Sequence, residues 1–195
     1  MSLNPQDKSV ANPIPIPEVG VVPARLARVI EVGVHDTFYG EKDQVILFYS
    51  LPTRIIEAEG DYNGKQHMIR TAPLRKSSSD KATLMEHVNV LNPAATDLDQ
   101  LLDKPCFVTI IHNEVESGGA SRTFANISNV SGVPEGIEVG ALDTTPFYFD
   151  YDNPDEDIWT SQLWDGVRDQ IKDAKNYPGS KVEEMVLRLE AMKAE

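Results

Sequence analysis

Cys106 is the only cysteine in the 195-residue chain, and His112 follows it six residues later in the stretch KPCFVTIIHN. A thiol and an imidazole can form a nucleophile–base pair when they come within about 3 Å of each other. The stretch alternates as a strand does, which puts both side chains on one face, but six strand residues span about 20 Å. We therefore expect no catalytic pair. Cys106 is expected to be a small buried apolar side chain, and His112 to lie at a strand end.

The remaining residues also form no pattern that would support catalysis. His35, His67 and His87 stand at no metal-ligating spacing. The chain has no phosphate-binding loop, no dinucleotide-binding fingerprint and no nucleophile elbow. The sequence predicts that the protein is not an enzyme and needs neither a metal nor a cofactor.

A binding chemistry fits better, because arginines and lysines recur beside aromatic residues on the expected strands and loops. Cations neutralise phosphates, and aromatic rings stack on bases at about 1–3 kcal/mol per base. Each aromatic residue taken alone is more typical of a core, and the run VILFYSL leaves open which of Phe48 and Tyr49 faces a groove. The candidate nucleic-acid-binding residues are Arg25, Arg28, Phe38, Tyr39, Phe48, Tyr49, Lys65, Arg70, Arg75, Lys76, Arg122 and Phe124.

The charge distribution supports one local contact with a polyanion. The formal net charge is −13, yet residues 65–79 carry Lys65, Arg70, Arg75 and Lys76 and no acid. A basic strip on an acidic chain indicates a bound polyanion whose contact is confined to one place. A solvated strand and loop would give the same pattern, and charge alone does not separate the two.

These residues depend on elements that the hydrophobic pattern predicts. Strands are expected over 24–36, 44–51, 65–74, 104–113 and 122–130, with a bend or bulge at Gly33 in the first. A helix is expected over 77–92, between the third and fourth strands. This order predicts a mainly β fold with helices, a five-stranded oligonucleotide/oligosaccharide-binding (OB) barrel. Periodicity alone also permits other small barrels or a split α+β sheet.

Three regions of the chain differ in composition. Residues 1–22 are proline-rich, which predicts an extended arm, and they lack the pattern of a secretory signal. Residues 23–142 would form the nucleic-acid-binding domain. Residues 143–195 hold 13 acidic and 6 basic side chains and predict an acidic linker followed by two helices. One helix is expected from Asn153 to about Asn176, and a second after a capping box of Ser180 and Glu183.

Several stretches resemble a family of bacteriophage single-stranded-DNA-binding proteins with an OB fold. They are VPARLARVIEVGVHD, FYSLP, LDQLLDKPCFVTIIHNE, FANISNVSGVPEG and FDYDNPDEDIW, followed by IKDAKNYPGSKVEEMV, in which AKNYPGS is the most specific. Together they cover most of residues 20–190. The resemblance implies binding of single strands without sequence preference during phage DNA replication or recombination. It implies no cofactor, and a location in the host cytoplasm.

The aromatic and acidic segment at 147–159 has the composition of a partner-binding surface. Its candidate residues are Asp150, Asp152, Asp155, Glu156, Asp157 and Trp159, which would contact phage or host replication proteins. The segment precedes two helices, so we expect it to dock on the barrel or on a neighbouring subunit. Homo-oligomerisation and a preference for DNA or RNA stay open, and no segment is apolar enough to cross a membrane. The alternative function is a phage structural or protein-interaction module on the same barrel, without DNA binding.

Overall fold

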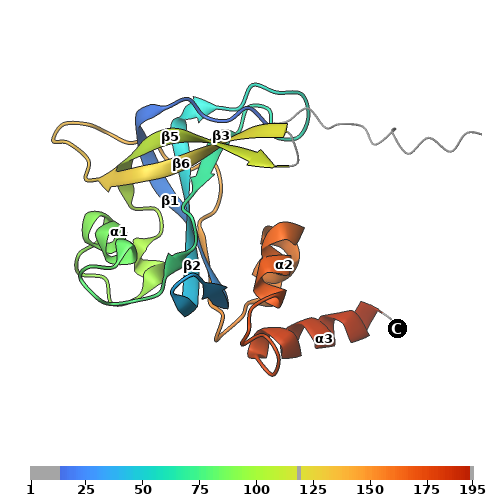
Figure 1. Ribbon diagram of the computed structural model, residues 1–195. Helices are drawn as coiled ribbons and strands as arrows, with labels where there is room; N and C mark the ends of the chain where they lie inside the picture. The colour runs from blue at the N-terminus through green and yellow to red at the C-terminus, as the bar shows by residue number, and fades with distance from the viewer. Residues whose placement is uncertain (1–13, 118–119, 194–195) are drawn as a thin grey trace, which may run out of the picture.

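The structure is a computed structural model that describes residues 14–117 and 120–193, without the side chains of Ser117, Ala120 and Arg122. Residues 1–13 of the expected arm lie outside the described residues. The chain is mainly β with a few helices, as expected (Figure 1). In chain order the elements are β1 (Gly20–Thr37), β2 (Gly40–Ile55), β3 (Gln66–Arg70), β4 (Leu74–Arg75), α1 (Thr83–Leu91), the 3-10 turn η1 (Leu98–Leu101), β5 (Pro105–Ser117), β6 (Ala120–Ser131), β7 (Phe147–Phe149), the π-helical turn η2 (Ile158–Gln162), α2 (Asp165–Lys172) and α3 (Lys181–Lys193).

All of these strands belong to one seven-stranded sheet whose main path runs β3-β2-β1-β5-β6. β4 pairs with β2, and β7 pairs with β1 in parallel, whereas the other pairs are antiparallel. The expectation of a closed barrel of five strands is therefore wrong. The sheet has two further strands, and over the residues that the structure describes no ladder joins β3 to β6.

Two local features explain the additional strands. Pro73 has no N–H to donate, so the single strand expected over 65–74 divides into β3 and β4. Phe147 and Phe149 are buried on one side of a short extended segment, and this segment pairs with β1 where a linker was expected. Burial of the two rings favours this pairing over a solvated linker.

The bend expected at Gly33 is confirmed. The β1–β2 register shifts between Glu31 and Gly33, and Gly33 has a φ of +83°, which favours glycine. A Cβ atom there would lie 2.7 Å from the Tyr151 ring and 2.8 Å from the side chain of Ala174. The C-terminal part of the chain therefore packs closely against β1 at this bulge.

Two apolar clusters lie on opposite faces of β1 and β2. In β2, Leu47 and Tyr49 enter the cluster beneath α1, η1 and β5. The alternate residues Ile46 and Phe48 enter a second cluster with β7, η2, α2 and α3. Figure 1 shows α1 and the pair α2–α3 on different sides of the β1–β2 ribbon. The run VILFYSL is apolar on both faces because both faces are covered.

The C-terminal extension docks on the sheet of its own chain, which was one of the two arrangements expected. The Lys175 N–H donates to the Val34 carbonyl at 2.8 Å, and the Val34 N–H donates to Asn176 Oδ1 at 2.8 Å. Ser180 caps α3 as expected, since the Glu183 N–H donates to Ser180 Oγ at 3.2 Å. The Glu183 carboxylate accepts its hydrogen bond from the Gly179 N–H, one residue before the position that a full capping box uses.

The continuous helix expected from Asn153 to about Asn176 is wrong. The chain leaves η2 at Leu163, which is extended and buried, and α2 begins only after Trp164. Trp164 packs edge-on against Phe48, with ring centroids 5.1 Å apart. Tertiary packing of these two side chains therefore overrides the helical pattern of the sequence.

The structure confirms that Cys106 is a buried apolar side chain. It has no exposed surface within the first cluster, and burial raises the pKa of its thiol to about 12. The thiol is therefore protonated near neutral pH and is not a nucleophile. His112 lies within β5 and not at a strand end as expected, and its Nε2 is 2.8 Å from the Pro17 carbonyl oxygen. In the described ranges, no helix combines the length and the hydropathy that crossing a bilayer requires.

Candidate nucleic-acid interface

A groove of about 820 Å³ is lined by residues of both β3 and β6. Its walls come from segments far apart in the sequence: the arm at Ile14–Pro17, the turn before β3, β3 itself, the middle of β6 and Trp164 of the C-terminal extension. The groove occupies the position at which a closed barrel would have joined β3 to β6.

Three cationic side chains line the groove: Arg28, Lys65 and Arg70. Lys65 and Arg70 are exposed, and no described carboxylate lies within 4.0 Å of either cation. Asp143 is the one acidic residue in the lining, and its Oδ2 accepts a hydrogen bond from the Gln66 N–H at 2.6 Å. The lining therefore carries a net positive charge on a strongly acidic chain.

Arg28 is held between two aromatic rings. Its guanidinium carbon lies 5.3 Å from the centroid of Phe147 and 5.7 Å from that of Trp164. Its Nε is buried without a hydrogen-bond partner among the described residues. Burial lowers the pKa of Arg28, against opposing contributions from Tyr62 and Asp143, but a guanidinium stays charged at neutral pH. The two rings fix its orientation in the wall of the groove.

Three aromatic side chains line the groove with partly open faces. Tyr62 is 56% exposed, Phe124 is 48% exposed and Trp164 is 40% exposed. Lys65 Nζ lies 5.9 Å from the centroid of the Tyr62 ring. Tyr62 and Trp164 were not among the residues predicted from the sequence. Tyr62 stands directly before the Asn63–Gly64 turn that leads to Lys65, a signal that could have found it, whereas Trp164 was assigned to a helix.

Of the predicted nucleic-acid-binding residues, the groove brings together Arg28, Lys65, Arg70 and Phe124. Arg75 is exposed on β4 and does not line it, and the side chain of Arg122 lies outside the described residues. Phe38 and Tyr39 form an edge-to-face pair at the tip of the β1–β2 hairpin, also outside the groove.

Four other predicted residues make contacts within the fold, and for two of them, the buried Phe48 and Tyr49, the assignment as binding residues is wrong. Phe48 and Tyr49 are buried in the two clusters and cannot stack on a base. The Tyr49 hydroxyl lies 2.7 Å from His87 Nδ1. Arg25 donates to the carbonyl oxygens of Gly140 at 2.8 Å and Asp103 at 2.6 Å, tying β1 to two loops.

Lys76, the fourth of these residues, pairs with a buried carboxylate. Its Nζ lies 2.7 Å from Glu31 Oε1, and Glu31 is only 1% exposed. Glu31 also accepts hydrogen bonds from the Tyr148 hydroxyl at 2.8 Å and from the Tyr151 N–H at 3.3 Å. Burial lowers the pKa of Lys76, but its hydrogen bond to Glu31 and the charge of Glu31 outweigh this and raise the pKa. This network joins β1 to β7 and gives the Lys76 ammonium, whose side chain is 32% exposed, an internal partner.

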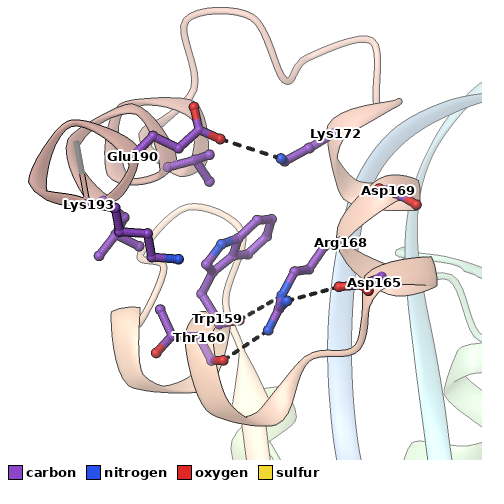
Figure 2. A pocket seen from close by; sticks show the side chains of 10 residues that line it. Trp159, Thr160, Asp165, Arg168, Asp169, Lys172, Glu190 and Lys193 are labelled. Atoms are coloured by element: carbon purple, nitrogen blue, oxygen red, sulfur yellow. Dashed lines mark hydrogen bonds and ion pairs between the residues drawn. The ribbon is translucent and has the colours of Figure 1, made fainter.

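The candidate partner-binding residues do not form one surface. Asp155 Oδ1 accepts a hydrogen bond from the Ile158 N–H, and Glu156 pairs with Arg188 of α3. Asp157 is exposed beside them, and Asp150 and Asp152 border a separate cleft. Trp159 is buried among the C-terminal helices. Figure 2 shows its indole beside a small cleft of about 240 Å³, where Arg168 donates to the Trp159 and Thr160 carbonyls. Of the six residues only Trp159 is buried, and the five acids are exposed or half-exposed on different parts of the C-terminal extension.

Comparison with known proteins does not identify a family: no protein-family model, no curated protein and no solved structure matches the chain.

Proposed function

We propose that the chain binds single-stranded DNA without sequence preference, through the groove between β3 and β6. The sheet order supports an OB-like fold as its framework. Three consecutive strands form a meander, a helix follows, and a hairpin returns its first strand to the far side of β1. An OB fold is a partly open five-stranded barrel with this connection pattern, and β4 and β7 are additions to it.

The observation that carries the proposal is the meeting of three cations and three partly exposed rings in one groove. Lys65 and Arg70, which are exposed, would neutralise phosphates, and Arg28 would present a fixed guanidinium beside them. Tyr62, Phe124 and Trp164 would stack on bases. Because every base has an aromatic face, stacking of this kind does not discriminate between sequences.

The acidity of the whole chain is compatible with such binding, because the attraction is local. Carboxylates elsewhere repel the polyanion from other surfaces, which confines contact to the groove. In the role that we propose, the protein would coat single strands during phage DNA replication or recombination in the host cytoplasm. Neither a cofactor nor a chemical step is required.

A fluorescence-anisotropy titration with labelled oligo-dT at several salt concentrations tests the proposal. Three phosphates neutralised on a single strand give a slope of log K against log salt of about −2, or about a twentyfold loss of affinity between 50 and 200 mM salt. The double variant Lys65→Gln/Arg70→Gln should reduce the slope to about −0.7. Arg75→Gln/Lys81→Gln is the matched control, because it removes two exposed cations outside the groove.

The proposal fails if oligo-dT does not bind at 50 mM salt, or if both double variants reduce the slope equally. The second result would mean that overall charge governs binding. The same titration with an oligo-rU of equal length reports the preference between DNA and RNA.

One observation favours a second function, a protein-interaction module. The groove includes Ile14 and Ile16 of the arm, which are each about two-fifths exposed, so an extended apolar segment can lie along its wall. A module of this kind would assemble with other chains and would not bind DNA. Light scattering during size-exclusion chromatography, run beside the titration, separates the two functions.

A further inference from the structure

A second cleft, of about 500 Å³, shares no residue with the groove. It lies between α1, the segment 95–98 that leads into η1, and β7 with the residues that follow it. Its floor is apolar: Leu84 and Val88 belong to the buried core, and Met85 and Leu98 pack against that core while keeping part of their surface exposed.

The rim of this cleft is acidic. Asp97, Asp150 and Asp152 border it, and no described basic side chain lies within 4.0 Å of their carboxylates. The one cation in the lining, Lys76, is engaged by the buried Glu31. The carboxylates affect their neighbours, since Asp150 contributes, after burial and Glu31, to raising the pKa of Tyr148. The cleft therefore combines an apolar floor with unpaired negative charge.

We propose that this cleft binds a cationic amphipathic segment of a partner protein. Leucine- or methionine-like side chains of that segment would cover the floor, while lysines or arginines would face Asp97, Asp150 and Asp152. Nucleic acid is disfavoured, because the carboxylates repel phosphates. A second copy of the chain is disfavoured by its own charge of −13. The inference goes beyond DNA binding and does not depend on it.

The test uses methyl NMR of the full-length protein labelled with carbon-13 at the methionine methyl groups. Met85 lines the cleft, Met68 lines the groove, and Met192 is exposed on α3. The probe is a 14-residue peptide of leucine and lysine at helical spacing. We expect the chemical shift of the Met85 methyl signal to change with added peptide until it saturates. The methyl signals of Met68 and Met192 should keep their chemical shifts. Oligo-dT should shift Met68 and leave Met85 unchanged, so the two sites are tested separately.

Charge-matched variants show whether the rim is responsible. Asp97→Asn/Asp152→Asn should weaken the peptide about fivefold, as expected for the loss of two exposed ion pairs. Glu57→Gln/Asp173→Asn removes two exposed charges elsewhere and should change the affinity less than twofold. A peptide with glutamate in place of lysine should leave Met85 unshifted.

Three results would overturn the inference. One is a Met85 signal that does not respond to the peptide. Another is an equal response of Met85 and Met192, which would indicate attraction to the acidic chain as a whole. The last is a Met85 shift that depends on protein concentration alone, which would show that a second copy covers the cleft.

Discussion

Replacing Lys76 by methionine separates a structural role of this residue from a DNA-binding role. In the folded chain its Nζ lies 2.7 Å from Glu31 Oε1 and 3.7 Å from Asp43 Oδ2. Lys76→Met keeps most of the aliphatic volume and leaves Glu31 without a cation. The carboxylate would then be stabilised only by the Tyr148 hydroxyl and the Tyr151 N–H.

The magnitude follows from burial. Removing one partner of a buried ion pair costs about 3–5 kcal/mol, because the remaining charge is left uncompensated in a low dielectric. Glu31 is 1% exposed, but the Lys76 side chain is 32% exposed, and solvent therefore screens part of the interaction. With this discount we expect Lys76→Met to lower the free energy of unfolding by about 2–3 kcal/mol.

Urea unfolding followed by circular dichroism measures this change. The double variant Glu31→Gln/Lys76→Met removes both charges, and its free energy of unfolding should lie within about 1 kcal/mol of that of the natural chain. Arg75→Met, at the neighbouring exposed position, should change stability by less than about 0.5 kcal/mol. Under conditions in which Lys76→Met is folded, its affinity for oligo-dT should stay within twofold of the natural chain.

The pH dependence gives a second measurement of the same network. The pKa values of Lys76 and Tyr148 are both raised on folding. Their contribution is therefore fully present below about pH 9, where both groups are protonated in either state, and it is lost as the pH rises through the folded pKa values. If Lys76→Met keeps the full free energy of unfolding but binds oligo-dT weakly, the structural role is refuted and Lys76 is again a candidate phosphate ligand.

Three further predictions concern other parts of the fold. Burial lowers the pKa of His87 to about 4, so the free energy of unfolding should fall by about 3 kcal/mol as the pH falls from 6.5 to 4. Urea titrations of His87→Gln should show a weaker dependence of this free energy on pH. Gly33→Ala should cost about 2–4 kcal/mol, because its Cβ meets three side chains at positive φ; Gly136→Ala, at similar φ in open space, should cost only about 1 kcal/mol by the same urea assay. Phe38→Ser/Tyr39→Ser should leave oligo-dT affinity within twofold by anisotropy, because the hairpin tip lies outside the groove.

The strands of the sheet could be predicted where alternation or β-branched runs mark them. β1, β2 and the hairpin of β5 and β6 were expected, as was the bulge at Gly33. β7 was not expected, because three residues are too few for a periodic signal and the acids after them indicated a linker. The break before α2 was also missed. This break depends on the contact of Trp164 with Phe48, two residues far apart in the sequence, so the pattern of neighbouring residues does not reveal it.

The site was harder to predict than the fold, because composition does not show which cations have internal partners. Lys76 and Arg70 stand in the same basic strip, but only Lys76 meets a buried carboxylate. That carboxylate, Glu31, lies 45 positions away in a strand of different pattern. Tyr49 and Tyr62 show the same limit for aromatic residues: one is fully buried and the other is more than half exposed.

The C-terminal extension completes the folded unit and the groove together. Ile30, Val32, Ile46 and Phe48 have little or no exposed surface because β7, η2, α2 and α3 cover them. Trp164 leaves the helical path, packs on Phe48 and lines the groove beside Arg28. An extension that covers a core and supplies a wall of the groove is part of the folded unit and not a detachable acidic tail. Removing it would expose apolar surface and dismantle the proposed binding groove, so point variants within the groove are the informative perturbations.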